Sequence, residues 1–235
     1  MRCSFCFSLY RIKKRTGTNM RLRNIPGADE RIDGSIFVVH EPEGHQGQWK
    51  SEVFASKGPL FVEIGCGKGM FLTEMAKRHP EHNYLGIEKM SSVLLRAVQK
   101  VESLDPAPQN LFFMRFDAEH IQDIFGEGEV DGIFLNFSDP WPKDRHHKRR
   151  LTSREYLARY EKILKPGAAV EFKTDNAGLF DFSLEEAAAA GWEVVMQTRD
   201  LHKSPYAADN IMTEYEDRFA TLGNKIMKLI MVRPF

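Results

Sequence analysis

One carboxylate stands inside a rigid, cation-flanked segment of this 235-residue chain, which reads SDPWPKDRHHKRR over residues 138–150. Pro140 and Pro142 each fix one backbone angle, so Asp139 and Trp141 are held in place at little further entropic cost. A carboxylate fixed in this way is suited to orienting a reacting group or to stabilising positive charge that develops on it. The competing interpretation is a proline-stiffened loop in which Trp141 packs as a lid.

The six residues at the end of this segment are all cationic or able to become so. The chain as a whole gives no sign of a nucleic-acid partner, because Lys plus Arg and Asp plus Glu each number 33. A local basic run beside the predicted active centre is more specific, since the backbone of an RNA would supply its counter-charge. We therefore expect an RNA substrate that contacts Arg145, His146, His147, Lys148, Arg149 and Arg150.

A glycine-rich turn, EIGCGKG, marks a second place where chemistry is expected. It puts Gly65, Gly67 and Gly69 at the end of an apolar run, and open α/β sheets bind nucleotide-type cofactors at such strand ends. Met70 stands where the dinucleotide fingerprint needs its last glycine. The turn therefore favours a cofactor without a pyrophosphate.

Acidic residues mark the ends of three successive predicted strands. Glu63 precedes the glycine turn and suits a cationic amino-acid group. Glu88 lies where an acid usually accepts from ribose hydroxyls, and Asp117 lies where a carboxylate would meet an adenine amino group. A tight turn or a helix cap would explain any one of these residues alone, but explains their joint placement less readily.

Alternating strand and helix patterns must position these residues. Seven apolar runs are expected as strands, at 60–65, 83–88, 111–117, 130–137, 168–176, 192–200 and 225–233. Helical patterns lie between them, at 70–79, 91–104, 118–125, 154–164, 179–191 and 213–223. Thr152 and Glu155 have capping-box spacing for a helix that is expected to end at Pro166-Gly167. The alternation predicts a Rossmann-like α/β fold, with a mostly parallel seven-stranded sheet and helices on both faces.

The segments before residue 58 are expected to be extensions of one domain spanning 58–235. Residues 20–57 mix Gly, Pro and charge and are expected to form an N-terminal arm, whose arginines would extend the basic footprint. Residues 1–19 put an apolar run before a basic one, the reverse of a secretory signal. Because Met20 begins a plausible natural start, MRLRN, we expect 1–19 to be disordered or a non-native start extension.

Cysteine content and hydropathy favour a cytoplasmic protein. The three cysteines are too few for a disulfide framework, and no stretch has the apolar length of a membrane span, so no membrane partner is expected. The pair in CSFC has metal-like spacing but no second pair or histidine to complete four ligands. We therefore expect no metal site.

Two levels of resemblance follow from these motifs. The EIGCGKG turn and its acids resemble class I S-adenosylmethionine-dependent methyltransferases over residues 60–235. SDPWPKDRHHKRR, FKTDN and TEYE together resemble the bacterial tRNA (guanine-N7-)-methyltransferase family, often called TrmB. The resemblance implies S-adenosylmethionine as cofactor, tRNA as partner and methylation of N7 of a guanosine in the tRNA variable loop. It also favours a homodimer.

The resemblance implies a role for each matching residue. Asp139 matches the family's proposed catalytic residue. The cofactor-binding positions are Glu63, Gly65, Gly67, Glu88, Asp117, Ala118 and Asp139. The substrate-binding positions are Lys143, Asp175, Thr213, Glu214, Tyr215 and Glu216, and the run from Arg145 to Arg150 contacts RNA. Thr213 and Glu216 equally fit a capping box. Lys173 and His202 have weaker claims to a role.

Two other functions remain open from the residues alone. An adenine amino-group methyltransferase also carries an Asp-Pro pair after its fourth strand, but DPWP lacks the second adjacent proline and the aromatic residue after it. A non-catalytic RNA-binding module that keeps its cofactor for structure would not need all four acids, Glu63, Glu88, Asp117 and Asp139. Both alternatives predict a different outcome in a methyl-transfer assay.

Overall fold

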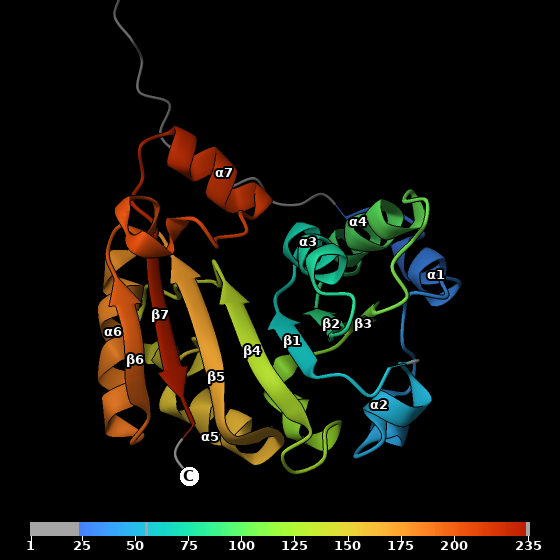
Figure 1. Cartoon of the computed structure of the whole chain (residues 1–235), viewed down its shortest axis with the longest axis horizontal. Helices are drawn as coiled ribbons and strands as arrows, with labels where there is room; N and C mark the ends of the chain where they lie inside the picture. Colours follow the sequence, from blue (N-terminus) through green and yellow to red (C-terminus); the bar gives the residue numbers. More distant parts are fainter. Residues whose placement is uncertain (1–23, 55, 234–235) are drawn as a thin grey trace, which may run out of the picture.

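The computed structural model describes residues 24–54 and 56–233, which form one sheet covered by helices (Figure 1). The strand order is β3-β2-β1-β4-β5-β7-β6. The four interfaces from β3 to β5 are parallel and the two that involve β7 are antiparallel, which confirms the mostly parallel seven-stranded sheet. The strands are β1 (Leu60–Ile64), β2 (Asn83–Glu88), β3 (Leu111–Arg115), β4 (Val130–Asn136), β5 (Leu164–Thr174), β6 (Glu193–Thr198) and β7 (Met227–Val232).

Helices cover both faces of the sheet, as predicted. The α-helices are α1 (Ala28–Asp33), α2 (Trp49–Glu52), α3 (Met70–Arg78), α4 (Ser91–Glu102), α5 (Arg154–Ile163), α6 (Ala177–Ala189) and α7 (Glu214–Thr221). Neighbouring strand residues such as Tyr84 and Leu85 point to opposite faces. Tyr84 belongs to an apolar cluster with residues of α1, α3 and α4, whereas Leu85 belongs to a second cluster with residues of α5 and α6. The central strands are apolar on both sides because both sides are covered.

Short 3-10 helices supply the remaining connections: η1 (Pro42–His45), η2 (Ala118–Asp123), η3 (Asp144–Arg149), η4 (Leu201–Lys203) and η5 (Pro205–Ala207). The helix expected over 118–125 is therefore a 3-10 helix that ends at Asp123 and is kinked at His120. Among the described helices, none is long and apolar enough to cross a membrane.

The start of α5 corrects one prediction. Thr152 does not cap this helix, because Ser153 is the N-cap residue and Thr152 Oγ1 accepts a 2.7 Å hydrogen bond from Ser183 Oγ. The exposed amide at the helix start is bound instead by the Glu186 carboxylate of α6, 2.7 Å from Arg154 N. A tertiary contact thus satisfies a donor that the sequence pattern assigned to a local side chain.

The end of α5 corrects a second prediction. The helix ends at Ile163 rather than at Pro166-Gly167, and β5 begins directly at Leu164. Leu164 pairs with Val130, but the next pair joins Ala169 to Gly132, so the proline and glycine lie in a register shift of the strand. A bulge of this kind tolerates a proline because the residues in it give up their ladder hydrogen bonds.

The described part of the N-terminal arm packs into the domain. Trp49 is fully buried and its Nε1 donates to Ile124 O at 2.7 Å. Val38 forms a parallel bridge with Phe113 of β3. The predicted boundary at residue 57 stays a prediction, and the expectation for 1–19 lies outside the described residues.

Candidate active site

The glycine turn connects β1 to α3 at the carboxyl edge of the sheet. Gly65 and Gly67 have φ of 76° and 59°, a left-handed backbone that side chains other than glycine adopt with strain. Gly69 also has a left-handed φ, of 72°, and any larger residue there would clash, since its Cβ would lie 2.9 Å from the Cβ of Ala97. Gly65 N and Cys66 N both donate to Ile87 O, at 2.8 and 3.1 Å, which fixes the turn against β2.

Glu63, the acid before this turn, is buried with one oxygen unpartnered. Its exposed fraction is 2%, and Oε1 accepts from Asn136 Nδ2 at 2.8 Å. Oε2 has no hydrogen-bond partner among the described residues. Burial raises the pKa of Glu63 to about 8, against the opposing effects of the Asn136 hydrogen bond and the charge of Lys173. A buried carboxylate with a vacant acceptor fits a cationic donor, such as the amino group of S-adenosylmethionine.

The other two predicted acids lie at the ends of the next strands along. Glu88 accepts from Gly67 N at 3.2 Å and from Met90 N at 2.9 Å, and burial raises its pKa. Asp117 caps η2 by accepting from Glu119 N at 3.2 Å, and its hydrogen bond from Lys89 lowers its pKa. Ala118, the next residue, is 8% exposed. Glu63 and Glu88 thus lie in β1 and β2, whereas β3 ends at Arg115 and Asp117 and Ala118 follow it at the start of η2. All four positions lie at the carboxyl ends of three adjacent strands, as the sequence predicted.

Asp139 is exposed, in a half-buried loop that directly follows β4 and whose backbone is constrained at two points. Phe137 and Trp141, on either side of it, have φ of 55° and 40°. Left-handed backbone at non-glycine residues costs energy and persists only where the surroundings enforce it, which is common at functional sites. Because β4 is the parallel neighbour of β1, the loop that follows β4 lies at the same edge of the sheet as the acids described above.

Arg150, predicted to contact RNA, supports this loop. Its Nε donates to Pro140 O at 3.0 Å and one terminal nitrogen donates to Trp141 O at 3.2 Å. Its guanidinium also lies 4.3 Å from the ring centre of Phe182 on α6. These contacts occupy much of the side chain, so Arg150 is less available to RNA than an unpaired cation.

The rest of the basic run forms η3, in which no residue is buried. Arg149 lies over the Trp141 ring at 5.2 Å, and the His146 ring meets the same indole edge-on at 5.7 Å. Lys148 Nζ lies 3.3 Å from Glu155 Oε1 of α5. Arg145 and His147 of the helix are exposed, and so is Lys143, which precedes it. The run therefore offers a contiguous cationic surface beside the Asp139 loop.

The TEYE segment opens α7, which Figure 1 shows above the carboxyl ends of β4 and β5. Thr213 Oγ1 accepts from Glu216 N at 3.0 Å, which confirms the helix cap. The Glu216 carboxylate does not return to the Thr213 backbone as a capping box requires. It is fully buried and points into the protein, whereas Glu214 forms an ion pair with Lys100 of α4.

Aromatic contacts join α7 to the Asp139 loop. The Tyr215 ring lies 4.8 Å from that of Phe137 and 4.1 Å from that of Phe219. Tyr215 is 42% exposed. Asp175, after β5, accepts from Asn224 Nδ2 at 3.0 Å and contributes to raising the pKa of Tyr215, whose main cause is burial. Two predicted substrate positions, Asp175 and Tyr215, are thus brought together at the mouth of the site.

A buried polar cluster beneath TEYE is the main feature that sequence reasoning missed. Lys173 of β5 is 3% exposed and its ammonium lies 2.8 Å from Glu216 Oε2. Glu216 Oε1 lies 2.8 Å from His202 Nε2 and accepts from Asn210 Nδ2 at 2.6 Å. Burial alone would raise the pKa of Glu216, but these partners hold it below its usual value. The only sequence signal was a lysine inside an apolar strand.

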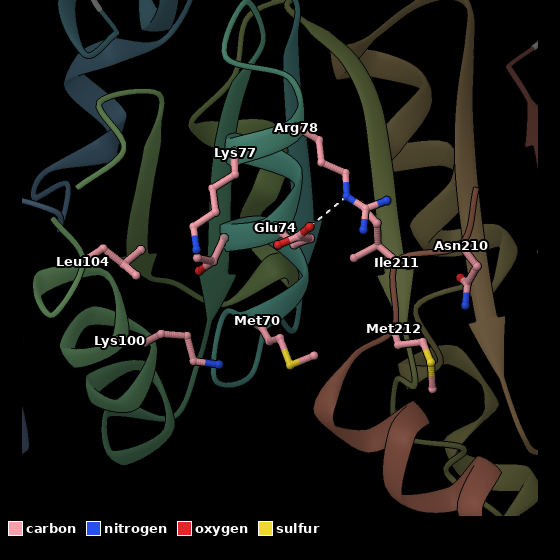
Figure 2. Close-up of a pocket in the computed structure, with 10 residues that line it drawn as sticks. Met70, Glu74, Lys77, Arg78, Lys100, Leu104, Asn210, Ile211 and Met212 are labelled. Carbon is pink, nitrogen blue, oxygen red and sulfur yellow. Dashed lines mark hydrogen bonds and ion pairs between the residues drawn. The ribbon is translucent and has the colours of Figure 1, made fainter. Parts of the chain in front are cut away.

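A cavity of about 480 Å³ lies between the outer surface of α3 and the segment 210–212 that precedes TEYE (Figure 2). Met70, the first residue of α3, lies at one side, and Ile211 and Met212 lie at the other. Lys100 reaches across from α4, and Arg78 is paired with Glu74 at 2.8 Å on the α3 surface between them. The cavity is an open groove with mixed apolar and charged walls.

One group of metal-type ligands occurs among the described residues, away from this site. The side-chain ligand atoms of His79, Glu81 and His82 lie within 4.8 Å of one another. These residues immediately precede β2, at the edge of the sheet opposite the glycine turn. They have no connection with the acids described above.

Comparison with known proteins places the chain in a family. Residues 57–229 match the family model described as "Putative methyltransferase". The tRNA (guanine-N(7)-)-methyltransferase of Lachnoclostridium phytofermentans is 56% identical, over 91% of this chain and 99% of that protein. The Bacillus subtilis protein of the same name is 43% identical, over 89% of this chain and 97% of its own length.

Solved structures show the same fold at low identity. The 16S rRNA methyltransferase KamB is 13% identical with a TM-score of 0.62, covering 80% of this chain and 94% of its own. A variant 16S rRNA (adenine-N(1))-methyltransferase from Catenulisporales acidiphilia, solved with cosubstrate SAM, is 16% identical with a TM-score of 0.56, covering 84% and 93%. From the family match and its near full-length relatives, this chain belongs to the bacterial tRNA (guanine-N(7)-)-methyltransferase family, which has the class I methyltransferase fold.

Proposed function

We propose that this protein transfers a methyl group from S-adenosylmethionine to N7 of a guanosine in the variable loop of tRNA. The observation that carries the proposal is the meeting of two features at one sheet edge: the Glu63 carboxylate with its vacant oxygen, and the constrained Asp139 loop. The family relationship supplies the choice of base and atom. When bound, S-adenosylmethionine supplies an electrophilic methyl on a sulfonium.

Residues of the chain would hold the cofactor by charge and hydrogen bonding. Glu63 Oε2 would accept from the amino group, and the left-handed turn at Gly65 and Gly67 would leave room for close approach of the cofactor to the backbone. Glu88 at the end of β2 and Asp117 just after β3 would accept from the ribose hydroxyls and the adenine amino group.

Asp139 would act on the purine rather than as a base. Guanine N7 carries a lone pair and no proton, so the reaction requires no proton to be removed there. The carboxylate would accept from the N–H donors of guanine and so hold N7 in line with the methyl, or would stabilise the ring as it becomes cationic. Lys143 would donate to O6, and Asp175 would accept from the Watson–Crick edge.

The experiment that tests this function follows methyl transfer from labelled S-adenosylmethionine to an unmodified tRNA transcript, then applies cleavage chemistry selective for 7-methylguanosine. We expect label, and cleavage in the variable loop that disappears when its guanosine is replaced by adenosine. Label without cleavage would move the target to another atom, including an adenine amino group. Cofactor binding without label would favour a non-catalytic RNA-binding module.

Removing charge from the basic run is expected to weaken tRNA binding without affecting the cofactor. For Arg145→Ala/Arg149→Ala, the KM for tRNA should rise by about tenfold, and the slope of log affinity against log salt should fall by roughly one per lost phosphate contact. Both side chains are exposed, so the fold should persist. Filter binding at several salt concentrations measures the slope.

A matched control removes two exposed cations from the opposite edge of the sheet. Lys162→Ala/Lys165→Ala changes the net charge equally, and Asp131, the partner of Lys165, keeps its ion pair with Lys50. An equal loss of tRNA affinity in both double variants would show that net charge, rather than the basic run, governs binding.

The homodimer and the cytoplasmic location also stand as proposals, resting on the family resemblance and on the low cysteine content. Light scattering on the purified protein, with and without tRNA, tests the oligomeric state.

A further inference from the structure

Lys173 occupies a junction between the two loops that form the candidate active site. Its ammonium is almost fully buried at the end of β5 and donates to three acceptors of the segment that leads into α7. These are Ile211 O at 2.8 Å, Asn210 Oδ1 at 3.1 Å and Glu216 Oε2 at 2.8 Å. All three donors of the ammonium are therefore used on one segment, 210–216.

The main chain of the same residue holds the other loop. Lys173 O accepts a 2.8 Å hydrogen bond from Phe137 N, at the point where β4 ends and the backbone turns into its left-handed conformation. Asp139 follows two residues later. The rings of Phe137 and Tyr215 also join the two loops directly. Lys173 is thus in contact with both loops, with one through its main chain and with the other through its side chain.

The carboxylate of Glu216, the partner of Lys173, is also bound entirely within the protein. Glu216 accepts from Lys173 and Asn210 and lies beside His202, so it has no free face toward the mouth of the site. The ring of Phe71 covers the ammonium, with its centre 5.3 Å from Nζ. The charge of Lys173 also acts on Glu63. Both members of the pair are shielded from solvent.

Stability alone gives a weak account of such a pair. Taking two charges out of water is costly, and apolar replacements of buried ion pairs are often neutral or stabilising. A buried pair does fix one arrangement of the segments that carry it, because any shift leaves a charge unpaired.

We propose that Lys173 is a positioning residue for methyl transfer, which acts through Glu216 to hold the segment 210–216 in register with the Asp139 loop. The inference rests on the proposed function and assigns Glu216 to positioning rather than to contact with the base. Methionine at position 173 would keep the length and apolar stem of the side chain and remove its three donors.

Lys173→Met is expected to lower kcat at saturating tRNA by at least about tenfold, while the Kd for S-adenosylmethionine stays within about threefold. The matched control is Lys50→Met, which breaks a 2.6 Å lysine–carboxylate pair with Asp131 at the opposite edge of the sheet. That control should leave kcat within about twofold. Equal kcat for Lys173→Met and wild type would overturn the proposal.

A double variant separates positioning from stability. Lys173→Met/Glu216→Met leaves no unpaired buried charge, so its thermal stability should recover relative to Lys173→Met. Its kcat should stay at the level of the single variant, because both residues act as one unit. Recovery of kcat together with stability would show a purely structural pair. A further additive loss would give Glu216 a separate role and equally overturn the proposal.

Two measurements cover the remaining outcomes. If Lys173→Met fails to fold, Asn210→Ala removes contacts to both charges more mildly, and its kcat should fall by about three- to tenfold. Hydrogen exchange should quicken in residues 137–141 and 210–216 of either variant, whether or not tRNA is the substrate. A wild-type protein without N7 methylation would therefore refute the proposed function, whereas unchanged exchange in both segments would refute the junction.

Discussion

Asp139→Asn is expected to lower kcat for tRNA methylation by about 100- to 1000-fold, the loss usual for one pre-organised electrostatic group. Cofactor affinity should stay within a few fold. Asparagine keeps the shape of the side chain and removes its charge. The loop should be unchanged, since Arg150 holds it through the carbonyls of Pro140 and Trp141 rather than through the carboxylate.

The control for this variant is Asp144→Asn. Asp144 lies five residues further on, in the first turn of η3, and is exposed like Asp139. It carries no assigned contact to base or cofactor, so kcat should stay within about twofold. Turnover of Asp139→Asn at the wild-type rate, measured with saturating tRNA, would remove the carboxylate from the mechanism.

The same variant separates the two roles considered for the carboxylate. If Asp139 accepts from the guanine N–H donors, a tRNA with inosine at the target position lacks the exocyclic amino group and should lose much of the rate with wild-type enzyme. Combining inosine with Asp139→Asn should then add little further loss, because both changes remove one interaction. Fully additive losses would favour stabilisation of the cationic ring by charge alone.

Local patterns were sufficient to predict much of the fold. The strands β1 to β4 and the helices α3 and α4 lie within a few residues of their predicted ranges, because apolar runs and helical spacing are properties of neighbouring residues. The acids Glu63, Glu88 and Asp117 could be assigned to one sheet edge for a related reason. Parallel strands carry their carboxyl ends to the same side, so three strand ends imply one site.

Contacts between distant residues account for what the sequence did not predict. The amide at the start of α5 is bound by Glu186, 32 residues away, so the nearer Thr152 was the wrong choice of cap. Lys173 and Glu216 are 43 residues apart, and no spacing rule joins them. Nothing in the sequence separates Arg150 from the other basic residues of the run. In the described structure it alone of the run donates to the carbonyls of the Asp139 loop.

Glu63 is expected to make the affinity for S-adenosylmethionine strongly dependent on pH. The pKa of this buried carboxyl is about 8 in the cofactor-free protein, so it is mostly protonated at pH 7. An ion pair with the amino group of S-adenosylmethionine requires the carboxylate. Binding well below pH 8 must therefore release a proton, and affinity should rise with pH. From about pH 6 to about pH 8 the rise should be about 20-fold, because the gain in carboxylate is partly offset by deprotonation of the amino group, whose pKa is about 7.8. Isothermal titration in buffers of different ionisation enthalpy measures both affinity and proton release.

Glu63→Gln should remove both effects. Loss of a hydrogen bond to a charged group is worth about 1.5–3 kcal/mol, so the Kd for S-adenosylmethionine should rise by about 10- to 150-fold at pH 8. The variant should show little dependence of affinity on pH. Glu171→Gln, a half-buried strand carboxyl paired with Lys228 outside the site, is the control and should keep the wild-type pH dependence. A wild-type affinity that is flat from pH 6 to 8 would contradict the assignment of Glu63.

The stability of Glu63→Gln relative to wild type shows whether its weaker cofactor binding comes from the lost carboxylate or from a damaged fold. Burial raises the pKa of Glu63 from 4.5 to about 8, so between these values the folded state keeps a proton that the unfolded state has lost. Its contribution to stability is fully present below the unfolded pKa and declines as pH rises toward 8. Glutamine has no proton to lose, so cofactor-free Glu63→Gln should be at least as stable as wild type at pH 8. The difference in stability between variant and wild type should favour the variant more at pH 8 than at pH 5. A variant that binds weakly yet unfolds at a higher temperature at pH 8 would show that Glu63 is kept for the cofactor at the expense of stability.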